Sequence, residues 1–95
     1  MDMIAERAKH APDPAEAMQF EQPELRFLIR LCQELQRVNG DKPFPLDGRV
    51  AAQKIRVPHP TAARWLRLLR FEKLLALIKK GIRHKASEYR YLGAL

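Results

Sequence analysis

Several features are scarce in this sequence of 95 residues, and each scarcity excludes a class of protein. One cysteine, Cys32, cannot form an internal disulfide, which fits a reducing compartment. That cysteine and the three histidines are scattered without metal-ligand spacing, so we expect no metal site. Apolar runs are short, and the N-terminus lacks the basic-then-apolar layout of a secretory signal. We therefore expect a cytoplasmic protein that has no membrane partner.

Catalytic motifs are missing as well. No Ser-His-Asp set, no pair of carboxylates and no glycine-rich phosphate loop stands out, and only six acidic residues follow position 21, spread singly. We therefore expect a protein that is not an enzyme and that uses no cofactor.

Charge is abundant and unevenly distributed. The formal net charge is +7, yet residues 1–21 carry −3 and residues 22–95 carry +10. With 46% hydrophobic residues, the chain can bury one small core. A compact part this basic favours a polyanionic partner, nucleic acid above all, over a merely solvated basic surface.

The acidic segment 1–21 contains Pro12 and Pro14 and little periodicity. We expect a flexible lead-in with a helical turn near Ile4 to Lys9, or a linker from a longer chain. The folded domain is expected at residues 22–95.

A first helix is predicted from Pro23 to Asn39, where Gly40 follows as a stop. Its core face comprises Leu25, Leu28, Ile29, Cys32 and Leu35, and its polar side comprises Arg26, Arg30, Gln33 and Arg37. The apolar arc is widened by Phe27, Leu31 and Val38. Either the N-terminal segment covers this wide face, or another subunit or a domain of a parent chain does.

Next, Pro43 and Pro45 allow only an edge strand. Asp47 is a suitable N-cap for a second helix, Gly48 to about Ile55, with Val50, Ala51 and Ile55 inward.

A third helix is predicted in the stretch "RVPHPTAARWLRLLR", from His59 or Pro60 to Arg70 or Glu72. On a helical wheel, Ala62, Trp65, Leu66 and Leu69 group on one side. Pro60, Ala63, Arg64 and Arg67 group on the other, with Arg70 at its edge. We expect Trp65 to belong to the core rather than to stack on bases.

A β-hairpin is predicted after this helix, with strands Leu75–Lys79 and Ser87–Leu92. Tyr89 and Tyr91 share one face, and we expect them to pack on the helices rather than to stack on single-stranded bases. The link is rich in lysine and arginine, which suits either contact with a polyanion or protection against edge-to-edge aggregation. Leu68 and Phe71 lie off the core face, either under the hairpin or in a subunit contact.

The order helix, short strand, helix, turn, helix and basic hairpin resembles the winged helix-turn-helix family over about residues 22–92. The residues that carry the resemblance are Val50-Ala51, Ile55, Val57, Thr61, Ala62, Arg64-Trp65-Leu66 and Leu69. It implies a mainly α fold with three helices and a small β-hairpin. Three positions depart from the family pattern: Arg56 and Lys73 replace glycines, and Pro58 replaces a Ser or Thr cap. We therefore expect a positive φ at Arg56 or an altered turn.

The resemblance also implies that the third helix enters the major groove of double-stranded DNA while the hairpin contacts the backbone or minor groove. The implied contacts on the third helix are His59, Pro60, Thr61, Ala63, Arg64 and Arg67. Those on the hairpin are Lys80, Arg83, His84 and Lys85. Arg49 and Lys54 are expected to bind flanking phosphates.

Three functions compete at this point. The first is a prokaryotic, nucleoid-associated transcriptional regulator that binds double-stranded DNA. The second is a DNA-binding appendage of a larger replication protein of the primase or helicase type. The third is a protein-interaction winged helix, whose surface would be the wide apolar face of the first helix.

Overall fold

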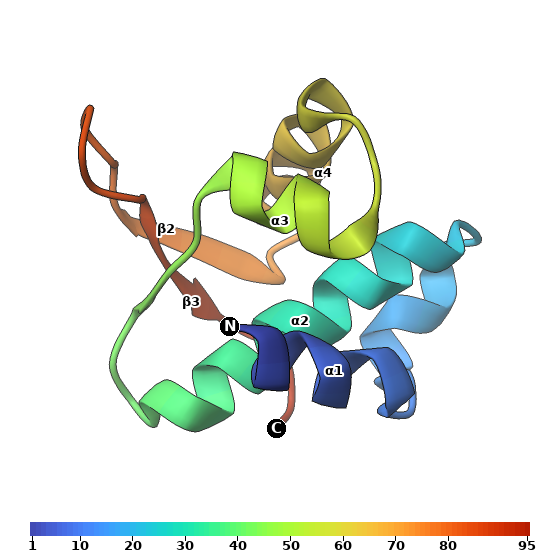
Figure 1. Cartoon of the computed structure of the whole chain (residues 1–95). Coiled ribbons are helices and arrows are strands. Elements are labelled where there is room, and N and C mark those ends of the chain that lie inside the picture. Colours follow the sequence, from blue (N-terminus) through green and yellow to red (C-terminus); the bar gives the residue numbers. More distant parts are fainter.

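The computed structural model describes residues 1–95 and is mainly helical, with four α-helices and a small three-stranded antiparallel sheet (Figure 1). No helix has both the length and the apolar character that crossing a membrane requires. The elements are α1 (Asp2–His10), the 3₁₀ helix η1 (Ala15–Gln19), α2 (Pro23–Asn39), β1 (Phe44–Pro45), α3 (Gly48–Ile55), α4 (His59–Phe71), β2 (Leu75–Lys79) and β3 (Glu88–Tyr91).

The sheet has the strand order β1-β3-β2, so β1 is an edge strand as its two prolines predict. Phe44 of β1 is opposite Tyr89 of β3, and Tyr91 of β3 is opposite Leu75 of β2. Both tyrosines are buried against the helices. Their predicted packing role is confirmed, and neither ring is open to a nucleic-acid base.

Local chemistry sets the helix boundaries. The Asp47 side chain accepts a hydrogen bond from the Arg49 amide at 2.7 Å and so caps α3. Gly40 ends α2 with φ of 64°. Arg56 ends α3 in the left-handed conformation, with φ of 60° and ψ of 52°, which confirms the expected positive φ. Pro58 caps α4 without a side-chain hydrogen bond.

The core is centred on α2, which packs against α1, η1, α3, β1 and β3 (Figure 1). Its buried apolar residues are Leu25, Leu28, Ile29, Leu31, Cys32 and Leu35. Burial raises the pKa of the Cys32 thiol to about 12, so this cysteine is an inert core residue. On α3, Ala52 is buried together with Ala51 and Ile55, whereas Val50, expected inward, is half-buried.

The N-terminal segment differs from the prediction of a flexible lead-in. Residues Asp2–His10 form a fourth helix that packs along α2, and Ala5, Ala8 and Ala17 are buried in the shared core. Pro12 and Pro14 end α1 and begin η1 rather than preventing structure. The small alanine side chains allow the close approach of α1 to α2. The N-terminal segment therefore covers most of the wide apolar face of α2, whereas Val38 near the end of the helix stays 55% exposed.

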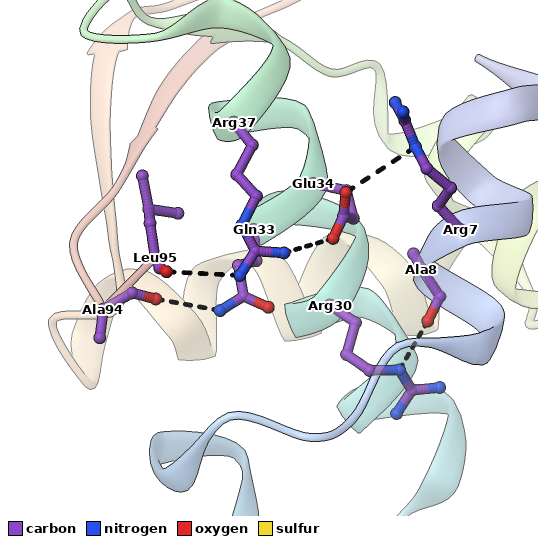
Figure 2. A network of polar contacts seen from close by, with 8 residues as sticks. All are labelled: Arg7, Ala8, Arg30, Gln33, Glu34, Arg37, Ala94 and Leu95. Carbon is purple, nitrogen blue, oxygen red and sulfur yellow. Dashed lines mark hydrogen bonds and ion pairs between the residues drawn. The ribbon is translucent and has the colours of Figure 1, made fainter.

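Polar contacts attach both ends of the chain to the side of α2 that was predicted to face solvent (Figure 2). Arg30 Nε donates to the carbonyl of Ala8 at 2.7 Å, and Gln33 Nε2 donates to the carbonyl of Ala94 at 3.0 Å. Glu34 pairs with Arg37, and lies 3.9 Å from Arg7 Nε. Gln33 and Glu34 are consequently buried, because the two chain ends cover them.

Candidate nucleic-acid interface

Helix α4 presents two different faces. Its first turn contains His59 and Pro60, and the proline is tolerated there because first-turn amides have no helical acceptor. Leu66 and Leu69 are buried on one face. Arg64, Arg67 and Arg70 are exposed, whereas Trp65, expected in the core, packs against it while remaining half-exposed. Helical periodicity thus separates an anchoring face from a cationic one.

The hairpin between β2 and β3 ends in a tight turn. The main chains of Ile82 and Lys85 exchange hydrogen bonds of 3.1 and 3.0 Å, which leaves Arg83 and His84 as the tip. A Cβ atom at Gly81 would lie 2.5 Å from the carbonyl oxygen of Lys85, so only glycine fits there. The tip residues and Lys85 are exposed.

A cleft of about 370 Å³, here called the α4–hairpin cleft, lies between α4, the start of α3 and the hairpin. It brings together four of the predicted contact residues, which are His59, Ala63, Arg67 and Lys85. The His59 ring lies over the α3 N-terminus, where Nε2 would be 3.4 Å from a Cβ at Gly48.

Most of the other predicted contact residues lie around this cleft without lining it. Arg64 and Pro60 are exposed on α4, and Thr61 is half-buried. Lys80, Arg83 and His84 are exposed on the hairpin, and Arg49 is exposed in the first turn of α3. These residues all belong to α3, α4 or the hairpin.

Lys54 is the exception. Its Nζ pairs with the Asp2 carboxylate of α1, and its side chain is 23% exposed. The hydrogen bond from Lys54, together with its charge, lowers the pKa of Asp2. Lys54 is thus engaged with the N-terminal helix, unlike the other predicted phosphate contacts.

The ion pairs are distributed asymmetrically over the molecule. All six involve bases of α1 and α2 or Lys54. Asp13, for example, pairs with both Arg26 and Arg30. No arginine of α4 and no arginine or lysine of hairpin residues 79–85 has an acidic partner or a side-chain hydrogen bond, whereas Arg90 of β3 donates to the carbonyl of Asp41 at 2.6 Å. The cationic side chains around the α4–hairpin cleft therefore make no ion pair within the chain, although the Asp47 carboxylate also lines the cleft.

Of the 14 residues that line the cleft, ten lie outside the predicted contact set, and Arg70, Ile82 and Ser87 are among them. Arg70 lines the cleft beside Arg67, and its spacing of three residues from Arg67 on a helix was the available signal. Ile82 and Ser87 line it from the hairpin. No sequence pattern marked these two, because only the turn geometry at Gly81 directs them toward α4.

The arrangement suits contact with an extended anion rather than chemistry on a small molecule. It offers mobile guanidinium and ammonium groups that can bind phosphates at several points. No three His, Cys, Asp or Glu side chains lie close enough to hold a metal ion. Comparison of the chain with protein-family models, with curated proteins and with solved structures found no match.

Proposed function

We propose that this chain is a winged helix-turn-helix domain that binds double-stranded DNA. Helix α4 would lie in the major groove, and the β2–β3 hairpin would contact the adjacent backbone or minor groove. The element order supports this assignment, because α3, a short turn and α4 are followed directly by a basic hairpin (Figure 1). The additional helix α1 lies on α2 and leaves α4 uncovered.

The observation that carries the proposal is the group of cations without acidic partners on two adjacent elements, α4 and the β2–β3 hairpin. Arg64, Arg67 and Arg70 on α4 are exposed and make no internal ion pair. The same holds for the lysines and arginine near the hairpin turn, which are Lys79, Lys80, Arg83 and Lys85. Free cations on two adjacent elements are what neutralisation of backbone phosphates requires.

The shape of α4 also supports insertion into DNA. An α-helix with its side chains is about 10–12 Å across, and the major groove is about 12 Å wide. Short side chains at Pro60, Thr61 and Ala63 would allow the start of α4 to approach base edges closely. Arg64 and Arg67 would then bind guanine edges or phosphates, each good bidentate base contact contributing about 1–3 kcal/mol of discrimination.

We place this domain in transcriptional regulation first and in a larger replication protein as the alternative. Both roles would use the same DNA interface. A protein-interaction role through the apolar face of α2 has less support. Most of that face is covered by α1 and η1, whose Ala5, Ala8 and Ala17 are buried against it.

The proposal is tested by replacing single arginines of α4. Arg64→Ala and Arg67→Ala should each weaken binding to a labelled DNA duplex, measured by fluorescence anisotropy, without lowering the melting temperature. If the removed contact is to a phosphate, the slope of log affinity against log salt should fall by about 1. Lys9→Ala is the matched control, because it removes the same charge from the exposed side of α1.

Two results would contradict the proposal. One is duplex affinity that does not decrease as salt is raised, since phosphate contacts release counterions. The other is an equal effect of Lys9→Ala and Arg67→Ala, which would mean that net charge rather than α4 determines binding. Selection of bound sequences from a random duplex pool would then separate sequence-specific from general binding.

A further inference from the structure

Strand β2 is an open edge of the sheet. The strand order β1-β3-β2 pairs β2 on one side only. The Leu92 amide donates to the carbonyl of Leu74, so these two residues form a hydrogen-bonded pair. Hydrogen-bonded and non-hydrogen-bonded pairs alternate along an antiparallel ladder. The pairs at Leu75 and Leu77 are therefore not hydrogen-bonded, and the main-chain groups of these two residues point away from β3. Neither residue appears in a main-chain hydrogen bond outside the regular elements. Leu75 is only 2% exposed, whereas Leu77 is half-buried and Ile78 and Lys79 are exposed, so the accessible part of this edge begins at Leu77 and offers main-chain groups to another extended chain.

A groove of about 480 Å³ runs beside this edge, between β2 and the end of α4. Phe71, 81% exposed, is the most exposed large apolar side chain of the molecule. It lines the groove together with Arg67, Arg70, Leu75, Ala76 and Leu77. Two guanidinium groups without acidic partners thus stand beside an apolar ring and an unpaired strand.

We propose that this groove binds an extended acidic peptide of a partner protein, which adds a strand to the open edge of β2. Main-chain hydrogen bonds would align the peptide with Leu77 and the exposed end of β2 that follows it. Peptide residues at alternate positions would point toward α4, placing carboxylates on Arg67 and Arg70 and an apolar side chain on Phe71.

Charge decides between this occupant and a second copy of the chain. A symmetric β2–β2 pair would bring the Lys79 and Lys80 side chains of two copies to one ribbon, beside four arginines of the two α4 helices. The chain carries a net charge of +7, so such an interface would be repulsive. An acidic strand meets the same surface with opposite charge.

The proposal goes beyond DNA binding and has a consequence for it. Arg67 and Arg70 line both this groove and the α4–hairpin cleft. Peptide and DNA would therefore compete for the same guanidinium groups, and an acidic partner would displace the domain from DNA.

The test uses the full chain and a fluorescein-labelled peptide of sequence Thr-Glu-Thr-Leu-Thr-Glu-Thr, followed by anisotropy. We expect saturable binding that Phe71→Ala weakens about tenfold, a loss typical of one anchoring contact. Duplex affinity of the same variant should stay unchanged, because Phe71 does not line the α4–hairpin cleft. Ile82→Ala is the matched control, since Ile82 is 73% exposed but lies outside the groove.

Two N-methylated peptides test strand addition itself. In one peptide the amides at odd-numbered positions are N-methylated, and in the other those at even-numbered positions. One should bind like the parent peptide and the other about tenfold more weakly, because only one set of amides faces β2. Equal binding of both would overturn the proposal, as would the absence of saturation up to about 1 mM. A dimer in sedimentation that Phe71→Ala dissociates would also overturn it, in favour of a second copy.

The outcomes for peptide and DNA are independent. Peptide binding without duplex binding would leave this inference standing and refute the proposed function. Duplex binding without peptide binding would support the proposed function and refute this inference.

Discussion

Two residues hold backbone conformations that their side chains disfavour. Arg56, with φ of 60°, and Lys73, with φ of 61°, are the only non-glycine residues with positive φ. Each ends a helix at a position where glycine is common, and the left-handed conformation costs an L-residue about 1–2 kcal/mol. The chain accepts this strain in order to turn sharply between α3 and α4, and again between α4 and β2.

Replacing Arg56 with glycine should therefore stabilise the protein. Relief of the left-handed strain should exceed the extra entropy of glycine in the unfolded chain, for a net gain of about 0.5–1 kcal/mol. Arg56→Ala is the control, because it removes the same charge but keeps the Cβ atom. Thermal melting of both variants checks the prediction, and equal melting temperatures would show that the charge rather than the backbone matters.

At the scale of elements, the buried face of α4 holds the helix in a fixed orientation, and this keeps its opposite face exposed to solvent. Leu69 is 1% exposed and Leu66 is 4% exposed, and both belong to the main core. Trp65 packs at the border of that core. The helix is thereby fixed against α3 and β2 while its arginines remain in solvent.

Truncating the buried face should cost stability in proportion to burial. Leu69→Ala should destabilise the protein by about 2–5 kcal/mol, the range for a fully buried leucine. Trp65→Ala should cost about 2 kcal/mol, less than the loss of a fully buried tryptophan, because Trp65 is only partly buried at the border of the core. Denaturant titration measures both. A larger loss for Trp65→Ala than for Leu69→Ala would mean that the indole carries more of the core than its exposure implies.

At the scale of the whole molecule, the N-terminal segment and the C-terminal tail are joined through Glu16 of η1. Its carboxylate accepts hydrogen bonds from the Tyr91 hydroxyl at 2.9 Å and from the Ala94 amide at 3.0 Å. A Cβ at Gly93 would lie 2.4 Å from the same carboxylate, so a side chain at this position would push the Glu16 carboxylate out of the contact. Burial acts to raise the pKa of Glu16, but hydrogen bonds from its own backbone, Tyr91 and Ala94 outweigh it and lower that pKa.

This contact makes stability depend on pH in a defined direction. A carboxyl group whose pKa is lowered on folding stabilises the protein above its ordinary value of 4.5, and that contribution is lost as the pH falls through the folded-state value. Glu16→Gln should therefore lower the melting temperature near neutral pH, and the difference from the unchanged protein should shrink in acid. Glu21→Gln, at an exposed site without an ion pair, should show no such convergence. Parallel melting curves at all pH values would contradict the assignment.

Much of the local structure followed from the sequence alone, because its causes lie within a few residues. The bounds of α3 and β2, the edge strand at Pro45, the Asp47 cap and the positive φ at Arg56 were all predicted and confirmed. Each depends on neighbouring main-chain groups or on helical and strand periodicity, which the order of residues determines directly.

Only the tertiary structure decided how distant segments meet. The pairing of Lys54 with Asp2 joins residues 52 positions apart. The packing of α1 on α2 and the α4–hairpin cleft likewise depend on segments far apart in the chain. Such contacts depend on whether the surfaces of two whole elements fit together, and the residues near either partner in the sequence do not reveal that fit. The three small alanines that hold the N-terminal segment on α2 show no strong pattern by themselves, so the segment was expected to be flexible until its packing surface was known.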